Sequence, residues 1–189
     1  MAMQGAPKLD VAPWRVPPPH TLEMQAAPEQ SSVTAVALDA LDNAATRTAA
    51  NYWRMLRGSR GLPARSALSP KDMRALLRNI VLLRVIDGGA DYEYRIVGDD
   101  FVWAYGLRFR GMRLTQIERA DPGHGARMRE LYEHVRVTAE PLGLQGWIGR
   151  DRPNSLFVYY ESVLLPFADD GRTVDHVLVC AFHVPKAPE

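Results

Sequence analysis

Residues 155–184 read SLFVYYESVLLPFADDGRTVDHVLVCAFHV, and this stretch decides the fold. Two runs rich in β-branched and aromatic residues, SLFVYYESVLLP and TVDHVLVCAFHV, flank DDGR, which has the composition of a turn. The turn-like segment RPNS separates them from an earlier run, LGLQGWIGRD, at residues 142–151. The pattern predicts three antiparallel strands at the end of the chain.

A second strand signal lies nearer the middle of the chain. Residues 80–86 (IVLLRVI) are apolar and mostly β-branched, the turn DGGAD follows, and YEYRIVG places Tyr92, Tyr94 and Ile96 at alternate positions. This pattern predicts a hairpin. Together with the three later strands it gives a five-stranded antiparallel sheet.

The segments between the strands carry helix signals. Ser69 and Pro70 mark the start of a short helix in SPKDMRALLRNI, and FVWAYG before Gly106 has the length of another. A long helix is expected from Asp121 and Pro122 to near Pro141. The order of elements predicts an α/β (α+β) fold with the helices on one face of the sheet.

The N-terminal part of the chain divides into two segments. Residues 1–34 hold six of the fourteen prolines without strand or helix periodicity, and we expect a disordered or extended tail. Residues 35–61 are expected to form an amphipathic leading helix. Its apolar stripe either crosses the following domain (63–184) or meets the same helix of a second subunit. The stripe, and with it the candidate dimer interface, consists of Leu38, Leu41, Ala45, Ala49, Tyr52 and Leu56.

Composition limits the possible partners and surroundings. The chain has 189 residues, is 47% hydrophobic and carries a net charge of +1, which favours one domain and gives no global attraction to nucleic acid or to membranes. It holds a single cysteine, Cys180, and no apolar run long enough to span a bilayer. We therefore expect a cytoplasmic protein, with residues 185–189 as a short tail.

Three stretches resemble a known family. YWRMLRGSRGLPARSALSPKDMRALLRNIVLLRV (52–85), YEYRIVGDDFVWAYG (92–106) and YYESVLLPFADDGRTVDHVLV (159–179) are similar to a bacterial single-domain PAS-like family. The family's pattern has a leading helix, a PaR…dP segment, a yRlvG strand end and a late ye…LPl strand. The resemblance covers about residues 52–184 and implies the PAS arrangement of sheet and helices, with a hydrophobic cleft between them.

The resemblance also implies where a ligand would lie. Aromatic and apolar residues from the middle helices and the sheet are available to line the cleft, and they suit a planar or apolar ligand with one or two polar groups. Packing of these side chains against one another is the alternative. Arg95 adds a guanidinium at the cleft mouth. The other lining candidates are Phe101, Trp103, Tyr105, Met128, Leu131, Tyr132, Trp147, Tyr160 and Phe182.

Few residues suggest cofactor or catalytic chemistry. His134 occupies the helix in which haem-binding PAS domains carry their proximal histidine, the residue that binds the haem iron. It lies beside the buried stripe, however, so no cofactor is predicted. His176 and Cys180 share one face of a strand while His183 points to the other, which excludes a metal trio. No nucleophile with an adjacent base is evident, and no enzyme activity is predicted.

The sequence therefore favours a PAS-like sensory or regulatory module. Such a module would bind a small ligand, a protein partner or both, and would pass a signal through the leading helix or a dimer interface. One alternative is an interaction or dimerisation scaffold whose cleft is filled by its own side chains. Another is a small acid/base enzyme, which would need a histidine or carboxylate inside the cleft with a hydrogen-bonded neighbour.

Overall fold

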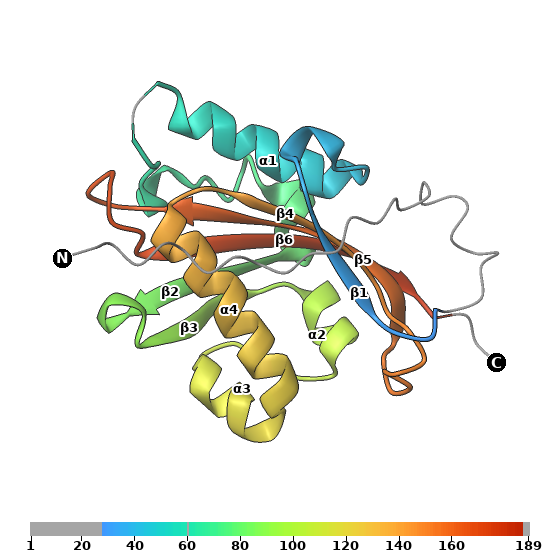
Figure 1. Cartoon of the computed structure of the whole chain (residues 1–189). Coiled ribbons are helices and arrows are strands. Elements are labelled where there is room, and N and C mark those ends of the chain that lie inside the picture. Colours follow the sequence, from blue (N-terminus) through green and yellow to red (C-terminus); the bar gives the residue numbers. More distant parts are fainter. Residues whose placement is uncertain (1–27, 60, 187–189) are drawn as a thin grey trace, which may run out of the picture.

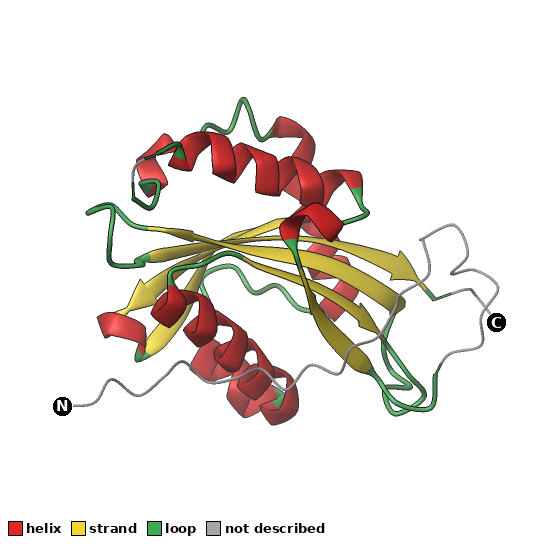
Figure 2. Cartoon of the chain, turned by 45° about the horizontal axis from the view of Figure 1, so that its top comes forward, coloured by secondary structure: helices red, strands yellow, loops and turns green. Residues whose placement is uncertain are grey.

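One antiparallel sheet of six strands runs through the molecule in the order β1-β4-β5-β6-β2-β3 (Figures 1 and 2). The computed structural model describes residues 28–59 and 61–186. The strands are β1 (Ser32–Val36), β2 (Ile80–Ile86), β3 (Asp91–Val97), β4 (Leu142–Trp147), β5 (Phe157–Phe167) and β6 (His176–Pro185). The expected hairpins β2–β3 and β5–β6 are both formed, and pairing of β2 with β6 joins them into one sheet.

Helices cover both faces of this sheet, as Figure 2 shows. The α-helices are α1 (Ala44–Arg57), α2 (Asp99–Tyr105), α3 (Leu114–Ala120) and α4 (Pro122–Thr138). Short 3₁₀ turns are η2 (Leu38–Ala40), η3 (Arg65–Ala67), η4 (Arg74–Asn79) and η5 (Asp87–Gly89). Helix α1 lies on one face, against β5 and β6, and α2, α3 and α4 lie on the other.

The expected position of the helices between the strands on one face of the sheet is correct for α2, α3 and α4, and the leading helix α1 covers the other face. Seven consecutive residues of β5, from Glu161 to Phe167, are buried, so both sides of this strand need cover. Val163, Leu165 and Phe167 belong to the core under α1, whereas Leu164 belongs to the core under α4. The sheet thus has two cores, one on each face.

Strand β1 corrects the expected five-stranded sheet and the expected tail boundary at residue 34. Its five residues pair with β4 in register from Ser32 opposite Trp147 to Val36 opposite Gly143. A single short run such as SVTAV next to a proline-rich segment carries too little periodicity to be recognised, and β4 supplies the missing stabilisation as a paired neighbour. Residues 1–27, the rest of the expected tail, lie outside the described residues.

Helix α1 begins later than the expected leading helix. The side chain of Asn43 accepts a hydrogen bond from the backbone N–H of Ala45 at 2.8 Å, which caps the helix, and Gly58 ends it with φ of +54°. All six residues of the expected stripe pack in the core between α1 and the sheet. Trp53 anchors the helix by donating from Nε1 to the Pro166 carbonyl at 2.8 Å. The stripe was expected either across the chain's own domain or against a second subunit, and the structure shows it across the chain's own domain.

Two local expectations need correction. The short helix expected from Ser69 begins later, at Arg74, and has the 3₁₀ geometry of η4. Ser69 instead closes the turn before η4, since its Oγ accepts from the Asp72 N–H at 3.3 Å. In β3, Ile96 is 39% exposed because a register shift opposite Leu82 and Leu83 interrupts the alternation.

Among the described residues, no helix combines the length and the apolar character needed to cross a membrane.

Candidate functional site

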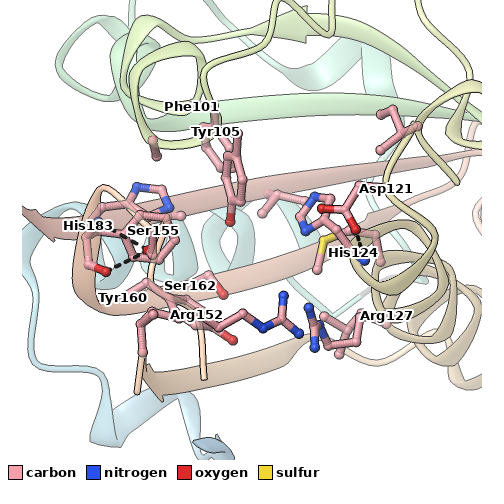
Figure 3. A pocket seen from close by; sticks show the side chains of 18 of the residues that line it. Phe101, Tyr105, Asp121, His124, Arg127, Arg152, Ser155, Tyr160, Ser162 and His183 are labelled. Carbon is pink, nitrogen blue, oxygen red and sulfur yellow. Dashed lines mark hydrogen bonds between the residues drawn. The ribbon is translucent and has the colours of Figure 1, made fainter. Parts of the chain in front are cut away.

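A cavity of about 660 Å³ lies between the sheet and helices α2 to α4 (Figure 3). Strands β5 and β6 form its floor through residues at every second position, since alternate side chains of a strand point to the same face. These floor residues are Tyr160, Ser162, Leu164, Val179, Ala181 and His183. Helices α2 and α4 add Phe101, Tyr105, His124, Arg127, Met128, Leu131 and Tyr132. A volume of this size suits a small organic ligand.

His183 is the most unusual residue of the floor. Its side chain is only 7% exposed, and neither Nδ1 nor Nε2 has a hydrogen-bond partner among the described residues. Burial lowers the pKa of the imidazole to about 4, so the ring is neutral at physiological pH and presents one donor and one acceptor. Leaving such buried groups unpaired costs roughly 1–3 kcal/mol each.

Aromatic rings enclose this imidazole. The centroid distances from His183 are 4.7 Å to Phe157, 5.5 Å to Phe101 and 5.7 Å to Tyr105, all with edge-to-face orientation. Burial raises the pKa of the Tyr105 phenol to about 12. The hydroxyls of Tyr105, Tyr160 and Ser162 make no hydrogen bond to another described residue. The floor is therefore mostly apolar, with several polar groups able to bind a ligand.

The mouth of the cavity is charged. Arg127 extends from α4 and Arg152 from the loop between β4 and β5, and Figure 3 shows their guanidinium groups directed toward one another. Asp121 and Asp151 lie at the same opening. Burial is the main cause that lowers the pKa of His124, so this second histidine of the cavity is also neutral at physiological pH.

Six of the expected ligand-binding residues do line the cavity. They come from two helices and one strand that are far apart in the sequence, and the fold brings them together. They are Phe101, Tyr105, Met128, Leu131, Tyr132 and Tyr160. The cavity that contains them is not filled by their own side chains, which was the alternative for this set of aromatic residues.

Four other candidates lie elsewhere. Trp103 is 43% exposed on the outer side of α2. Trp147 packs on Tyr159 at 5.4 Å in a separate small cluster, and Phe182 is excluded from the floor because its neighbours Ala181 and His183 occupy the cavity-facing positions. Arg95 is exposed and donates to Glu93 at 2.9 Å. Its guanidinium therefore lies on the solvent-exposed side of the edge strand β3 and not at the cleft mouth.

Of the residues considered for a cofactor or a metal, His183 lines the cavity, whereas His134, His176 and Cys180 do not. His134 is on α4 but does not line the cavity, and its backbone carbonyl accepts a hydrogen bond from the Thr138 hydroxyl. Cys180 is buried in the core under α1. In the part of the chain that the structure describes, no group of three histidine, cysteine, aspartate or glutamate side chains is arranged to hold a metal ion.

Sequence reasoning missed the polar part of the cavity. Strand periodicity correctly put His183 on the face opposite Cys180, and the same periodicity, applied to the choice of floor residues, would have selected His183 instead of Phe182. Arg127 and Arg152 had no comparable signal. Arg152 lies in a loop whose position depends on contacts with β1, which was not expected as a strand.

On the opposite face of β5, Glu161 is tied to the start of α1. The residue is 1% exposed, and its carboxylate accepts hydrogen bonds from the backbone N–H groups of Asp42 at 2.8 Å and Asn43 at 3.0 Å. Gln145 Nε2 donates to it at 3.0 Å, and the Thr46 hydroxyl also donates to it. A buried carboxylate with four donors is well satisfied and fixes the first turn of α1 to the strand.

The fold and the cavity together define a class of protein. In this class, short helices and one long helix cover one face of an antiparallel sheet and enclose a pocket large enough for a ligand. A family model described as PAS domain matches residues 41–181, and the chain belongs to this family of sensory and interaction modules. No curated protein and no solved structure gives a significant match.

Proposed function

We propose that this PAS domain binds a small organic molecule in the cavity above β5 and β6 and acts as a sensory or regulatory module. The observation that carries the proposal is His183, a neutral and buried imidazole in the cavity floor with both nitrogens unpaired among the described residues. Both nitrogens are covered by surrounding side chains, so a bound molecule that moved one of these aside and supplied a hydrogen-bond partner would remove the cost of this arrangement. The surrounding aromatic rings would hold its apolar part.

This function is favoured over the two alternatives. A scaffold with a self-filled cleft would have no cavity, whereas about 660 Å³ is open here. An acid/base enzyme would need a cavity histidine or carboxylate with a hydrogen-bonded neighbour. The rings of His124 and His183 have no such bond to another described residue. The cavity carboxylates Asp121 and Asp151 do accept hydrogen bonds, but these cap α4 and hold Ser31 at the mouth. We therefore assign a binding role to the cavity and no catalytic one.

The proposed route for the signal is β5. Tyr160 and Ser162 face the cavity, and Glu161 between them holds the start of α1 on the other face. A ligand that shifted this short stretch of β5 would change the geometry around the Glu161 carboxylate and so the position of α1. In this proposal α1 is the output element, read by a protein partner or by a second copy of the chain in the cytoplasm.

A fluorescent probe tests the binding function. N-phenyl-1-naphthylamine (NPN) is neutral, aromatic and bright only in apolar surroundings. We expect saturable binding of one NPN per chain, and we expect Ala181→Leu, which places a larger side chain in the floor, to weaken it at least about tenfold. Ala75→Leu, at an exposed position of η4, is the matched control.

Native mass spectrometry of freshly purified protein gives a second readout. An adduct of small-molecule mass on the unmodified protein that is lost in Ala181→Leu would support the proposal. The proposal fails if NPN binds Ala181→Leu as tightly as it binds the unmodified protein, or if neither NPN nor any adduct binds.

A further inference from the structure

Two arginines face each other at the cavity mouth. Arg127 lies near the N-terminus of α4, and Arg152 lies in the loop that precedes β5, so residues 25 positions apart present the same chemistry to one opening (Figure 3). Two like charges directed at one another repel unless an anion lies between them. An acidic side chain of the protein could supply this anion only if its carboxylate were free to reach both guanidinium groups.

The nearby carboxylates are engaged elsewhere. Asp121 accepts the backbone N–H of His124 at 3.0 Å and caps α4. Asp151 Oδ1 accepts from the backbone N–H and the hydroxyl of Ser31, at 2.7 and 2.8 Å. Arg152 is 4.0 Å from Asp151 Oδ2, at the outer limit of an ion pair. The side chain of Arg127 has no hydrogen bond and no ion pair with another described residue.

The charge of Arg127 also reaches the interior of the cavity. Burial raises the pKa of the phenols of Tyr105 and Tyr160, and the positive charge of Arg127 acts against this rise in both. At His124, burial lowers the pKa, the charge of Asp121 acts against this effect, and Arg127 and Arg152 add to the lowering. Beside Tyr105 and Tyr160 the cavity thus experiences a positive potential from Arg127, which favours a negatively charged guest there.

We infer that the ligand is an organic anion with a planar, apolar body, and that its acidic group binds between the guanidinium groups of Arg127 and Arg152. This inference rests on the proposed function. Guanidinium groups bind carboxylate, sulfonate or phosphate oxygens through paired, charge-assisted hydrogen bonds. The body of the anion lies over Tyr105 and Phe157, with a hydrogen-bonding group at His183.

Two matched probes separate the charge from the apolar body. 8-Anilinonaphthalene-1-sulfonate (ANS) has the skeleton of NPN with one added sulfonate. We expect ANS to bind the unmodified protein about tenfold more tightly than NPN, and the double substitution Arg127→Gln/Arg152→Gln to remove this advantage. Binding of NPN should change less than about twofold, because the apolar floor is untouched.

A control with the same change in net charge isolates the site. Arg74→Gln/Arg119→Gln alters two exposed arginines outside the cavity lining and should leave the affinities for both probes unchanged. Ala181→Leu identifies binding of ANS to the outer surface, since such binding persists in that variant. The inference is overturned if the two double variants weaken ANS equally, or if neither does while NPN still binds in the cavity. Failure of both probes to bind would instead overturn the proposed function.

Discussion

Two buried polar side chains, Glu161 and His183, lie on opposite faces of neighbouring strands and have opposite surroundings. Glu161 accepts four hydrogen bonds, so its burial stabilises one arrangement of α1 on the sheet. His183 has none from the described residues and weakens the fold that contains it. This contrast is the reason why we propose a binding role for His183 and a structural role for Glu161.

The depressed pKa of His183 predicts a specific dependence of stability on pH. Between pH 6.5 and about 4 the unfolded chain binds a proton that the folded chain excludes, so stability is lost as the pH falls through this range. Relative to His183→Phe, the free energy of unfolding of the unmodified protein should fall by about 2 kcal/mol between pH 7 and pH 5. Urea unfolding at the two pH values measures this difference.

The control for this prediction is His176→Gln. His176 also belongs to β6, but its Nδ1 is 2.7 Å from Asp175 and it lies outside the cavity lining. The His183 dependence should persist in that variant. At pH 7, His183→Phe should be at least as stable as the unmodified protein, because an unpaired polar group is replaced by an apolar ring. Equal pH profiles for His183→Phe and the unmodified protein would contradict the burial of a neutral imidazole.

At the scale of elements, β1 holds the cavity mouth in place. Ser31, just before β1, accepts the Gly149 N–H with its Oγ at 3.0 Å and donates to Asp151. Ser31 and Val33 are themselves part of the cavity lining. The loop that carries Arg152 is therefore attached to β1 by side-chain hydrogen bonds, in addition to the pairing of β1 with β4.

This attachment predicts the effect of two substitutions on ligand exchange. Ser31→Ala and Asp151→Ala both remove the hydrogen bond from Ser31 Oγ to Asp151, and each also removes one bond of its own, from the Gly149 N–H to Ser31 Oγ or from the Ser31 N–H to Asp151. Each should therefore make NPN leave the cavity roughly threefold faster, and the double variant should be faster by less than the product of the two single effects. Stopped-flow displacement of NPN measures the rate. Ser66→Ala, at an exposed position in η3, is the control and should not change it. Additive effects in the double variant would show that the two residues act separately.

The elements differ in how well sequence could predict them. The hairpins β2–β3 and β5–β6 and helix α4 have long periodic patterns, and each was expected near its observed bounds. Strand β1 has a local pattern too short to recognise, and the position of α1 depended on whether a second subunit or the chain's own sheet covered its stripe. The family resemblance predicted six apolar and aromatic residues of the cavity lining. It could not predict Arg127 and Arg152, because these residues are brought together only when the chain folds.

At the scale of the whole molecule, β5 is shared by two cores that otherwise lie on opposite faces of the sheet. Cavity residues and α1 contacts alternate along it, from Tyr160 through Glu161 to Ser162. Helix α1 contacts β5 and β6, and α4 contacts both of the same strands from the other side. A ligand that displaced β5 from the cavity side would therefore also displace the contacts of α1, because only the backbone of the sheet separates the two.

This path predicts that binding of NPN reduces amide hydrogen exchange at residues 43–47, the first turn of α1, although this turn lies on the other face of the sheet. Glu161→Gln should lower the free energy of unfolding by about 2 kcal/mol, because a charged acceptor is lost, and should still bind NPN. The protection at residues 43–47 should then disappear. Hydrogen exchange followed by mass spectrometry measures both proteins.

Glu130→Gln, at an exposed position of α4, is the matched control and should retain the effect. If residues 43–47 are protected equally in Glu161→Gln and in the unmodified protein, the signal does not pass through this carboxylate.

The pairing of β1 with β4 also has a consequence for where the domain begins. The family model matches from Leu41, whereas the last cavity wall and the outer strand of the sheet are built from residues 31–36. A chain shortened to the matched region would lose this wall and leave the backbone groups of β4 unpaired along one edge. Such an edge recruits strands from other molecules, so the shortened domain should tend to aggregate. The folded sheet of this protein therefore extends beyond the segment that the family model matches.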